Sequence, residues 1–294
     1  MEKKIKKIIC YGEVLWDQLS SVRRPAGAPV NVAYHLKKLG IQSYIISCVG
    51  NDLMGEELLK IIKKWGIDGT FCKVDNKFPT GKVVAKVDAS LQEVSYEIME
   101  PVAWDFIVLE KDHSDMIKNT DGFIFQSLTA RNEISRKTLH SLLECSYYKI
   151  FDVNLRPPFY SEKIIKELLK KSDFVKMSIS ELYEIVSWFK KGTITEKEAV
   201  CFLKEYLHLK EILISKGRYG ASYYGNDNLY ESWGIPINVK DTIGSGDAFL
   251  AGFLSKKING NSIEEAMNQA ITLGAFVASK EESCPYYNIV HNHI

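Results

Sequence analysis

Residues 241–247 read Asp-Thr-Ile-Gly-Ser-Gly-Asp and continue directly into the apolar run AFLAGFL at 248–254. This pattern predicts a glycine-flanked turn that opens a helix. Gly244 and Gly246 carry no side chain, so nearby backbone N–H groups can face outward. The first N–H groups of a helix have no intrahelical partner and favour negative charge. We therefore expect Gly244, Ser245 and Gly246 to form a binding site for an anion such as phosphate.

Asp247 stands at the mouth of this anion site, where a second negative charge is unfavourable unless it handles a proton. A carboxylate beside an anion hole is the arrangement expected of a general base that deprotonates an alcohol for attack on a phosphoryl group. The alternative is that Asp247 only caps the helix, a common role of aspartate. The heptapeptide alone leaves both interpretations open.

Composition places the chain among globular proteins and excludes several classes of partner. Hydrophobic residues make up 46% and charged residues 26% of the 294 residues, as in ordinary folded domains. Lys and Arg number 38 against 37 Asp and Glu, so no global charge recruits nucleic acid or an anionic membrane. The apolar run Ile8–Tyr11 is too short for a signal peptide, and no apolar stretch has the length of a membrane span. The six cysteines are scattered without a C-x-x-C pair, as expected of reduced thiols in a cytoplasmic protein.

Short apolar runs alternate with longer amphipathic runs, which predicts βαβ units and a mostly parallel sheet. Strands are expected at residues 5–12, 43–49, 122–125, 149–153, 174–177 and 211–215. Helices are expected at residues 29–39, 55–65, 161–171, 180–189, 195–207, 244–257 and 262–279. Three short strands without an intervening helix, at residues 70–74, 81–88 and 93–98, predict a small, mainly antiparallel flap within one α/β domain.

Polar residues follow several of the expected strands, where ligands gather in sheets of this kind. Asp17 could accept sugar hydroxyls or be a solvated turn residue. Gly27 and Asn31, at the start of a helix, could contact a polyol or serve as loop glycine and cap. Arg156 is held in place by the two prolines that follow it. Together these loops form an ordered series that ends in the anion site.

The segment SKGRYG (215–220) follows an expected strand and precedes another. Its glycines allow a backbone to approach a nucleotide closely, but they also suit any tight turn, which is the favoured interpretation of this segment alone. No P-loop, protein-kinase or Rossmann signature is present elsewhere.

The chain resembles the ribokinase-like carbohydrate kinases, the phosphofructokinase-B family. The segments that carry the resemblance occur in the family's order and span nearly the whole chain: AGAPVNVA (26–33), GNDLMG (50–55), DVNLRP (152–157), KMSISE (176–181), SKGRYG (215–220) and DTIGSGDAFLAGFL (241–254). The resemblance implies a three-layer α/β/α fold over residues 1–294 with a β-sheet lid from about residues 12–26 and 70–103. It further implies a soluble kinase that uses Mg²⁺-ATP to phosphorylate a sugar hydroxyl, and a possible homodimer through the lid.

The same resemblance assigns expected roles to individual residues. Asp247 is the general base, and Gly244, Ser245 and Gly246 stabilise the transferring phosphoryl group. The remaining implied contacts are Asp17, Gly27, Asn31 and Arg156 for the sugar, Ser215, Gly217 and Gly220 for the nucleotide, Glu181 for Mg²⁺ through water, and Asp241 and Thr242 for a possible monovalent cation such as K⁺.

Within the family, the chain is most similar to fructokinases, through GEVLWD (12–17), EPVAWDFI (100–107) and SLTAR (127–131). Fructose is therefore the expected substrate, with phosphorylation at the 6-position. The alternatives are 2-keto-3-deoxygluconate, ribose or a nucleoside as substrate, and a non-catalytic sugar- or nucleotide-binding regulatory protein. Four positions depart from the family pattern: Ala26, Gln126, Ser178 and the pair Glu282–Ser283, which stands where Gly-Ala usually closes the adenine pocket.

Overall fold

The computed structural model describes residues 5–18, 22–88, 93–225 and 228–288. Nine strands form one large sheet. In spatial order they are β13 (Leu229–Ser232), β12 (Ala221–Tyr224), β11 (Glu211–Ser215), β10 (Phe174–Ser178), β9 (Lys149–Asp152), β8 (Gly122–Gln126), β1 (Lys7–Tyr11), β4 (Gln42–Gly50) and β5 (Asp68–Asp75). Strands β12 and β13 are antiparallel to their neighbours and the other pairings are parallel. The six strands predicted for this sheet are confirmed.

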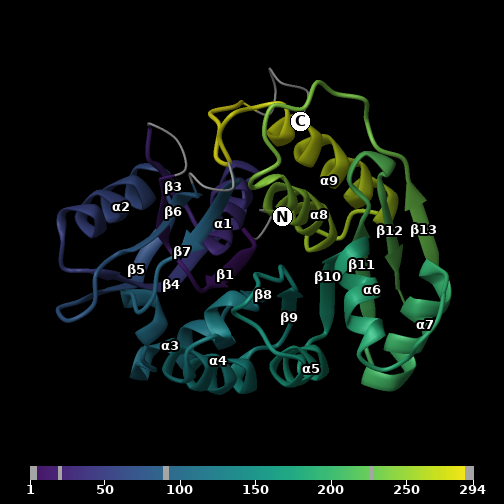
Figure 1. Cartoon of the computed structure of the whole chain (residues 1–294), viewed down its shortest axis with the longest axis horizontal. Coiled ribbons are helices and arrows are strands. Elements are labelled where there is room, and N and C mark those ends of the chain that lie inside the picture. Colours follow the sequence, from purple (N-terminus) through teal and green to yellow (C-terminus); the bar gives the residue numbers. More distant parts are fainter. Residues whose placement is uncertain (1–4, 19–21, 89–92, 226–227, 289–294) are drawn as a thin grey trace.

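Helices cover both faces of the large sheet (Figure 1). One face carries α1 (Ala28–Lys38), α2 (Leu53–Lys64), α8 (Ser245–Lys257) and α9 (Ile263–Ala278). The other carries α3 (Lys111–Lys118), α4 (Glu133–Cys145), α5 (Glu162–Lys170), α6 (Ile179–Ser187) and α7 (Glu196–Leu207). Short 3₁₀ turns occur at Ala103–Phe106, Leu128–Ala130 and Gly217–Tyr219. The three-layer α/β/α arrangement is confirmed, but α3 and α4 were not predicted.

A hydrophobic core lies on each face of the large sheet, and these two cores explain why the central strands are apolar on both sides. Along β1, Ile8 and Cys10 face the core beneath α1 and α8, whereas Ile9 and Tyr11 face the core beneath α4. Successive side chains of a strand point to opposite faces, so a strand covered on both faces reads as a continuous apolar run.

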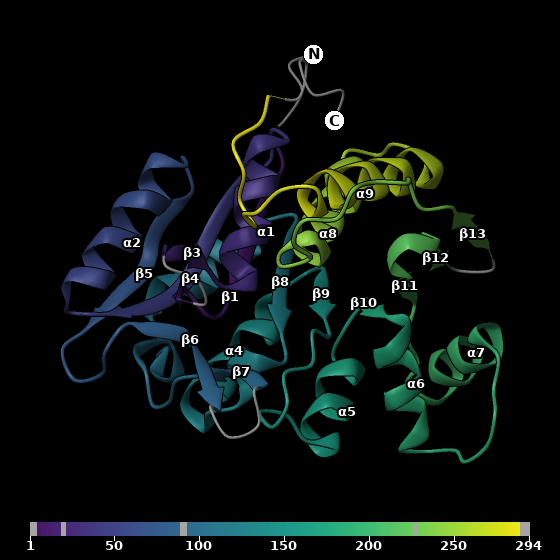
Figure 2. The ribbon, with the colours of Figure 1, turned by 45° about the horizontal axis from the view of Figure 1, so that its top comes forward.

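A second, smaller sheet packs beside the N-terminal half of the large one (Figure 2). Its strands, in order, are β3 (Arg24–Ala26), β2 (Leu15–Gln18), β6 (Gly81–Asp88) and β7 (Glu93–Ile98). The predicted flap is therefore present, but the strand expected at residues 70–74 does not belong to it. That segment is part of β5, which pairs parallel with β4 in the large sheet and completes a β4–α2–β5 crossover. The lid segment expected from about residue 70 therefore included residues 70–75, which belong to the large sheet.

Two helices, α1 and α8, begin after a glycine. Side chains cap the N-termini of α2, α4, α5, α6, α7 and α9. In contrast, the N-cap residues of α1 and α8 are Gly27 and Gly244, which have no side chain to accept a hydrogen bond from the helix. Among the described residues, no helix combines the length and apolarity that a bilayer crossing demands.

Candidate active site

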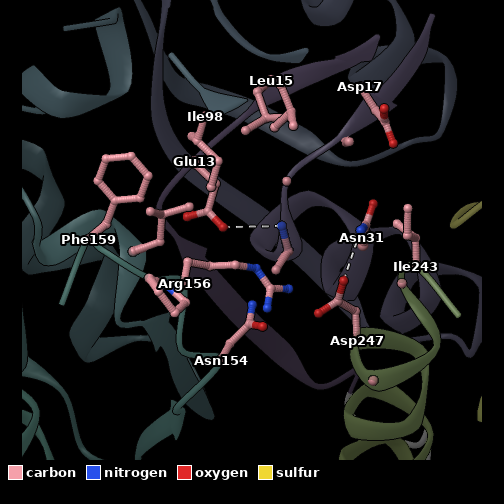
Figure 3. A pocket seen from close by; sticks show the side chains of 18 of the residues that line it. Glu13, Leu15, Asp17, Asn31, Ile98, Asn154, Arg156, Phe159, Ile243 and Asp247 are labelled. Carbon is pink, nitrogen blue, oxygen red and sulfur yellow. Dashed lines mark hydrogen bonds between the residues drawn. The ribbon is translucent and has the colours of Figure 1, made fainter. Parts of the chain in front are cut away.

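The order of the strands determines where the main cavity lies. From β1 the chain proceeds to β4 and β5 on one side and later to β8, β9, β10 and β11 on the other. Crevices form outside the carboxyl ends of the strands where the strand order reverses in this way. A cavity of about 820 Å³ lies there, bounded by loops that follow β1, β8 and β9, by the small sheet and by the start of α8 (Figure 3).

Most of the residues predicted to bind a sugar or to act on it meet in this first cavity. It is lined by Asp17 from β2, by Gly27 and Asn31 at the start of α1, and by Arg156 from the loop after β9. Gly244, Gly246 and Asp247 line it from the start of α8. The sequence therefore predicted a set of residues that the structure brings together.

Asp247 lies in the first turn of α8 with its side chain in the cavity (Figure 3). The residue is 8% exposed, and Asn31 Nδ2 donates a hydrogen bond to its Oδ2 at 2.9 Å. Burial, and next the charge of Asp152, raise the pKa of Asp247 to about 7, against the opposing effects of Asn31, Lys176 and Arg156. A carboxylate with this pKa can take up a proton near neutral pH.

A buried ion pair stands beside Asp247. Lys176 Nζ contacts Asp152 Oδ1 at 2.9 Å, and both side chains are almost fully buried. Burial alone would lower the pKa of Lys176, but the carboxylates of Asp152 and Glu181 outweigh this effect and raise it. A Cβ atom added at Gly246 would come within 3.3 Å of Lys176 Nζ, so a fixed positive charge lies close to the predicted anion site.

Gly244 is required by the local geometry. Its φ of +77° lies in the left-handed region that glycine tolerates best, and an added Cβ would lie 2.4 Å from Ser283 Cβ. The turn therefore presents the start of α8 to the cavity without an obstructing side chain, as expected for an anion site.

A second cavity, of about 630 Å³, lies on the other side of this turn. The predicted nucleotide residues Ser215, Gly217 and Gly220 line it, together with Ser245. Much of its remaining wall is apolar and comes from α9 and from the segment that follows β13: Ile235, Pro236, Ile237, Val239, Ile271 and Ala275. Thr242 and Gly246 line both cavities. The two cavities therefore meet at the turn that precedes Asp247.

The predicted metal residues lie near the site but mainly serve the local backbone. Glu181 caps α6 and accepts hydrogen bonds from the backbone N–H groups of Leu155 at 2.8 Å and Ser178 at 2.7 Å, and it is not among the residues that line the two cavities. Asp241 accepts from the backbone of Ile243, and the carbonyl of Thr242 accepts from Ser245. In the described part of the chain, no group of three or more His, Cys, Asp or Glu side chains could hold a metal ion by itself.

Glu13 is a site residue that the sequence analysis missed. It lines the first cavity at 2% exposure, where burial raises its pKa. Its carboxylate accepts a hydrogen bond from the backbone N–H of Ala28 at 3.3 Å and another from Thr129 Oγ1 at 2.8 Å. Glu13 thus accepts a hydrogen bond from the first N–H group of α1, although it lies in another part of the chain. An acid immediately after the first strand, in GEVLWD, was the available signal.

Three residues that depart from the family pattern, Gln126, Ser178 and Ser283, make defined contacts in the structure. Gln126 is buried and bridges Asp152 and Asn154. The Ser178 side chain caps α6 and forms a capping box with Glu181. Neither Glu282 nor Ser283 lines the second cavity, and an effect of this pair on nucleotide affinity stays a prediction. Ser283 instead contacts Asn31.

Comparisons with known proteins agree with this geometry. The sequence pattern of the pfkB family of carbohydrate kinases matches residues 3–287. Fructokinase-2 of Oryza sativa subsp. japonica is 26% identical over 311 residues, which cover 95% of this chain and 90% of that protein. The ATP-dependent 6-phosphofructokinase of Thermoanaerobacterium thermosaccharolyticum is 27% identical over 292 residues, covering 92% and 87%.

The crystal structure of fructokinase from Vibrio cholerae O395, in a form with bound fructose, ADP and calcium ion, superposes with a TM-score of 0.82 at 21% identity over 95% of both chains. This likeness establishes the ribokinase-like α/β fold. The family match covers almost the whole chain, and so the chain belongs to the pfkB family of carbohydrate kinases, which are sugar phosphotransferases.

Proposed function

We propose that this carbohydrate kinase transfers the γ-phosphoryl group of ATP to the 6-hydroxyl of fructose. The observation that carries the proposal is the position of Asp247 and Gly246, at the junction of a more polar cavity that suits a sugar and a more apolar cavity that suits a nucleotide. Catalysis of phosphoryl transfer consists mainly of positioning and charge stabilisation, which this junction can provide.

In the proposed reaction, Asp247 removes the proton from the sugar hydroxyl as the oxygen attacks the γ-phosphorus, and the bond to the bridging oxygen breaks so that ADP leaves. The backbone N–H groups at the start of α8 and the positive charge of Lys176 stabilise the negative charge on the transferring group. The small sheet would act as a lid that excludes water from the sugar cavity. Residues 1–294 would form one kinase domain.

The residues present fit a magnesium ion that arrives with the nucleotide. Mg²⁺ in kinases is held by substrate phosphates, water and one or two carboxylates, so it does not need a cage of protein ligands. Each oxygen of Glu181 accepts one backbone N–H group and retains a further lone pair for a water molecule. The bound ion would neutralise phosphate charge. Asp241 and Thr242 as ligands of K⁺, a dimer through the lid and a cytoplasmic location stay predictions.

The charges around the first cavity favour a neutral sugar. Five carboxyl groups line it, those of Glu13, Asp17, Glu97, Glu100 and Asp247. The positive side chains Arg156 and Lys176 both act electrostatically on Asp152 and Asp247, so part of their charge is already balanced. A sugar acid or a sugar phosphate would therefore meet net repulsion, whereas carboxylates readily accept hydrogen bonds from hydroxyls. This supports fructose over 2-keto-3-deoxygluconate and fructose 6-phosphate.

A panel of acceptors tests the proposed substrate. ADP release with Mg²⁺-ATP is measured for fructose, ribose, 2-keto-3-deoxygluconate, fructose 6-phosphate and adenosine, and the phosphorylated carbon is identified by NMR. We expect the highest kcat/KM with fructose, by roughly tenfold or more over each competitor, since one missing favourable contact has about this effect. A higher value with another acceptor would refute fructose, and no ADP release with any acceptor would favour the non-catalytic binding protein.

The pH dependence tests the role of Asp247. A general base must be ionised to accept a proton, and the pKa of Asp247 is raised to about 7. We therefore expect kcat/KM to decrease tenfold per pH unit well below this value and to level off above it. The profile is measured from pH 5 to 9 at saturating Mg²⁺-ATP. A constant kcat/KM between pH 5 and 8 would contradict this role.

A further inference from the structure

The side-chain amide of Asn31 joins Asp247 to the C-terminal segment, which we define as residues 281–287. Its Nδ2 donates to Asp247 Oδ2 at 2.9 Å. Its Oδ1 accepts from Ser283 Oγ at 3.2 Å and from Cys284 Sγ at 3.3 Å. Asn31 is 3% exposed and Ser283 8%, so water has little access to replace these contacts.

These contacts decide between two orientations of the amide. The oxygen and the nitrogen of an asparagine amide occupy nearly the same volume, so a half-turn about the last side-chain bond exchanges them. The exchanged orientation would point Oδ1 at the carboxylate of Asp247 and Nδ2 at the two donors. An ionised carboxylate can only accept, so Asp247 disfavours the exchanged orientation, and Ser283 and Cys284 supply donors to Oδ1 in the orientation in which Asn31 donates to Asp247.

The C-terminal segment is itself fixed on α1 by buried polar contacts. His35 Nε2 lies 2.9 Å from the Ser283 carbonyl, and His35 Nδ1 lies 3.0 Å from the hydroxyl of Tyr287. Burial lowers the pKa of His35 to about 4, so the ring is neutral at pH 7. A carbonyl can only accept, so Nε2 carries the proton and Nδ1 accepts from Tyr287. Tyr34 adds a hydrogen bond to the Pro285 carbonyl at 2.7 Å.

We propose that Ser283 and Cys284 are positioning residues for phosphoryl transfer, which hold the Asn31 amide so that it donates to the catalytic base. This inference rests on the proposed role of Asp247. The contact lowers the pKa of Asp247, because a donor stabilises the ionised form. The titratable and charged groups that act on Asp247 from the surrounding elements are Cys10 on β1, Asp152 on β9, Arg156 after β9, Lys176 on β10 and Cys284 itself. Burial raises the pKa of the Cys284 thiol, which stays neutral.

The double variant Ser283→Ala, Cys284→Ala removes both donors without changing a charge. With the best acceptor of the panel, we expect kcat at pH 6.5 to fall roughly tenfold, since a misdirected buried hydrogen-bonding group has about that effect. The KM for ATP is unchanged, because neither residue lines the nucleotide cavity. The acidic limb of the pH profile moves to higher pH. The loss of kcat relative to wild type therefore becomes smaller towards pH 9, where Asp247 is ionised in both proteins. Ser279→Ala, which removes only a hydrogen bond to the Phe276 carbonyl, is the control and keeps the wild-type profile.

An equal loss at every pH, or an unchanged profile, would overturn the inference. A measurement without substrate separates it from the proposed function: the carboxyl pKa of Asp247 is followed by ¹³C NMR of labelled aspartate, with the signal assigned from Asp247→Asn. We expect a higher pKa in the double variant and an intermediate one in Ser283→Ala alone, which also serves if the double variant is poorly folded. No change in either refutes the positioning role. A higher pKa in a protein that phosphorylates no acceptor supports the positioning and refutes the kinase proposal.

Discussion

Replacing Asp247 by asparagine is expected to lower kcat by about 10²–10⁴, the usual contribution of a general base. Asparagine has nearly the same shape and its Oδ1 can still accept the hydrogen bond from Asn31, but it cannot take up the hydroxyl proton. The KM for ATP should change little, because Asp247 lines only the first cavity. The variant is assayed for ADP release with the preferred sugar, and its sugar binding is measured by calorimetry.

The free energy of unfolding of the same variant, measured against pH, provides the control. The pKa of Asp247 is raised from 3.8 to about 7 in the folded protein, so the folded state binds a proton that the unfolded state has released between these values. Wild-type stability therefore decreases as pH rises from about 4 to 7 through this group. Asp247→Asn should be more stable than wild type at pH 8, and the difference should vanish below pH 4. Asp112→Asn, in the exposed first turn of α3, should leave both turnover and stability nearly unchanged. Near-normal turnover of Asp247→Asn would contradict its role as base.

Local patterns were sufficient to predict most of the elements and much of the site. The central strands are apolar because both faces are buried, so short continuous apolar runs reveal them. The turn before α8 is encoded by Gly244 and Gly246 within seven residues. Because ligands gather at the carboxyl ends of strands in such sheets, the polar residues Asp17, Asn31 and Arg156 were expected near one site. All three line the first cavity.

The errors concern contacts between distant parts of the chain. Whether the strand at residues 68–75 joins the large or the small sheet depends on its neighbour β4, and its own residues do not specify that pairing. Ser283 reaches Asn31 across 252 positions, and no local pattern indicates this contact. In contrast, α4 had local signals, a capping Asn132 followed by apolar residues at helical spacing, and it could have been predicted.

The burial of Glu13 shows why a site residue can escape sequence analysis even at a favourable position. A carboxylate is rarely buried without partners, and its two partners, Ala28 and Thr129, come from α1 and from the turn after β8. Only the folded arrangement explains how the charge is accommodated. Acids immediately after central strands are therefore candidate site residues even when no motif includes them.

Replacing Gly246 by valine is expected to reduce kcat by about 10²–10³, the effect of losing a backbone donor at an anion site. Gly246 lines both cavities, and an added Cβ would come within 3.3 Å of Lys176 Nζ. The branched side chain of valine would occupy the passage through which the phosphoryl group must reach the sugar. Gly246→Ala should show a smaller loss of turnover.

Stability again distinguishes a blocked site from a damaged fold. Gly246 is the second residue of α8, so the gain in helix propensity on changing it to alanine, up to about 1 kcal/mol, is opposed by the close approach of the new Cβ to Lys176. We therefore expect Gly246→Ala to melt near the wild-type temperature while it turns over more slowly. Gly69 in β5 is the matched control, because its added Cβ would also have its nearest neighbour, Ile62, at 3.3 Å, but it lines neither cavity. Gly69→Val should retain wild-type turnover, and a fully active Gly246→Val enzyme would show that phosphoryl transfer does not pass this turn.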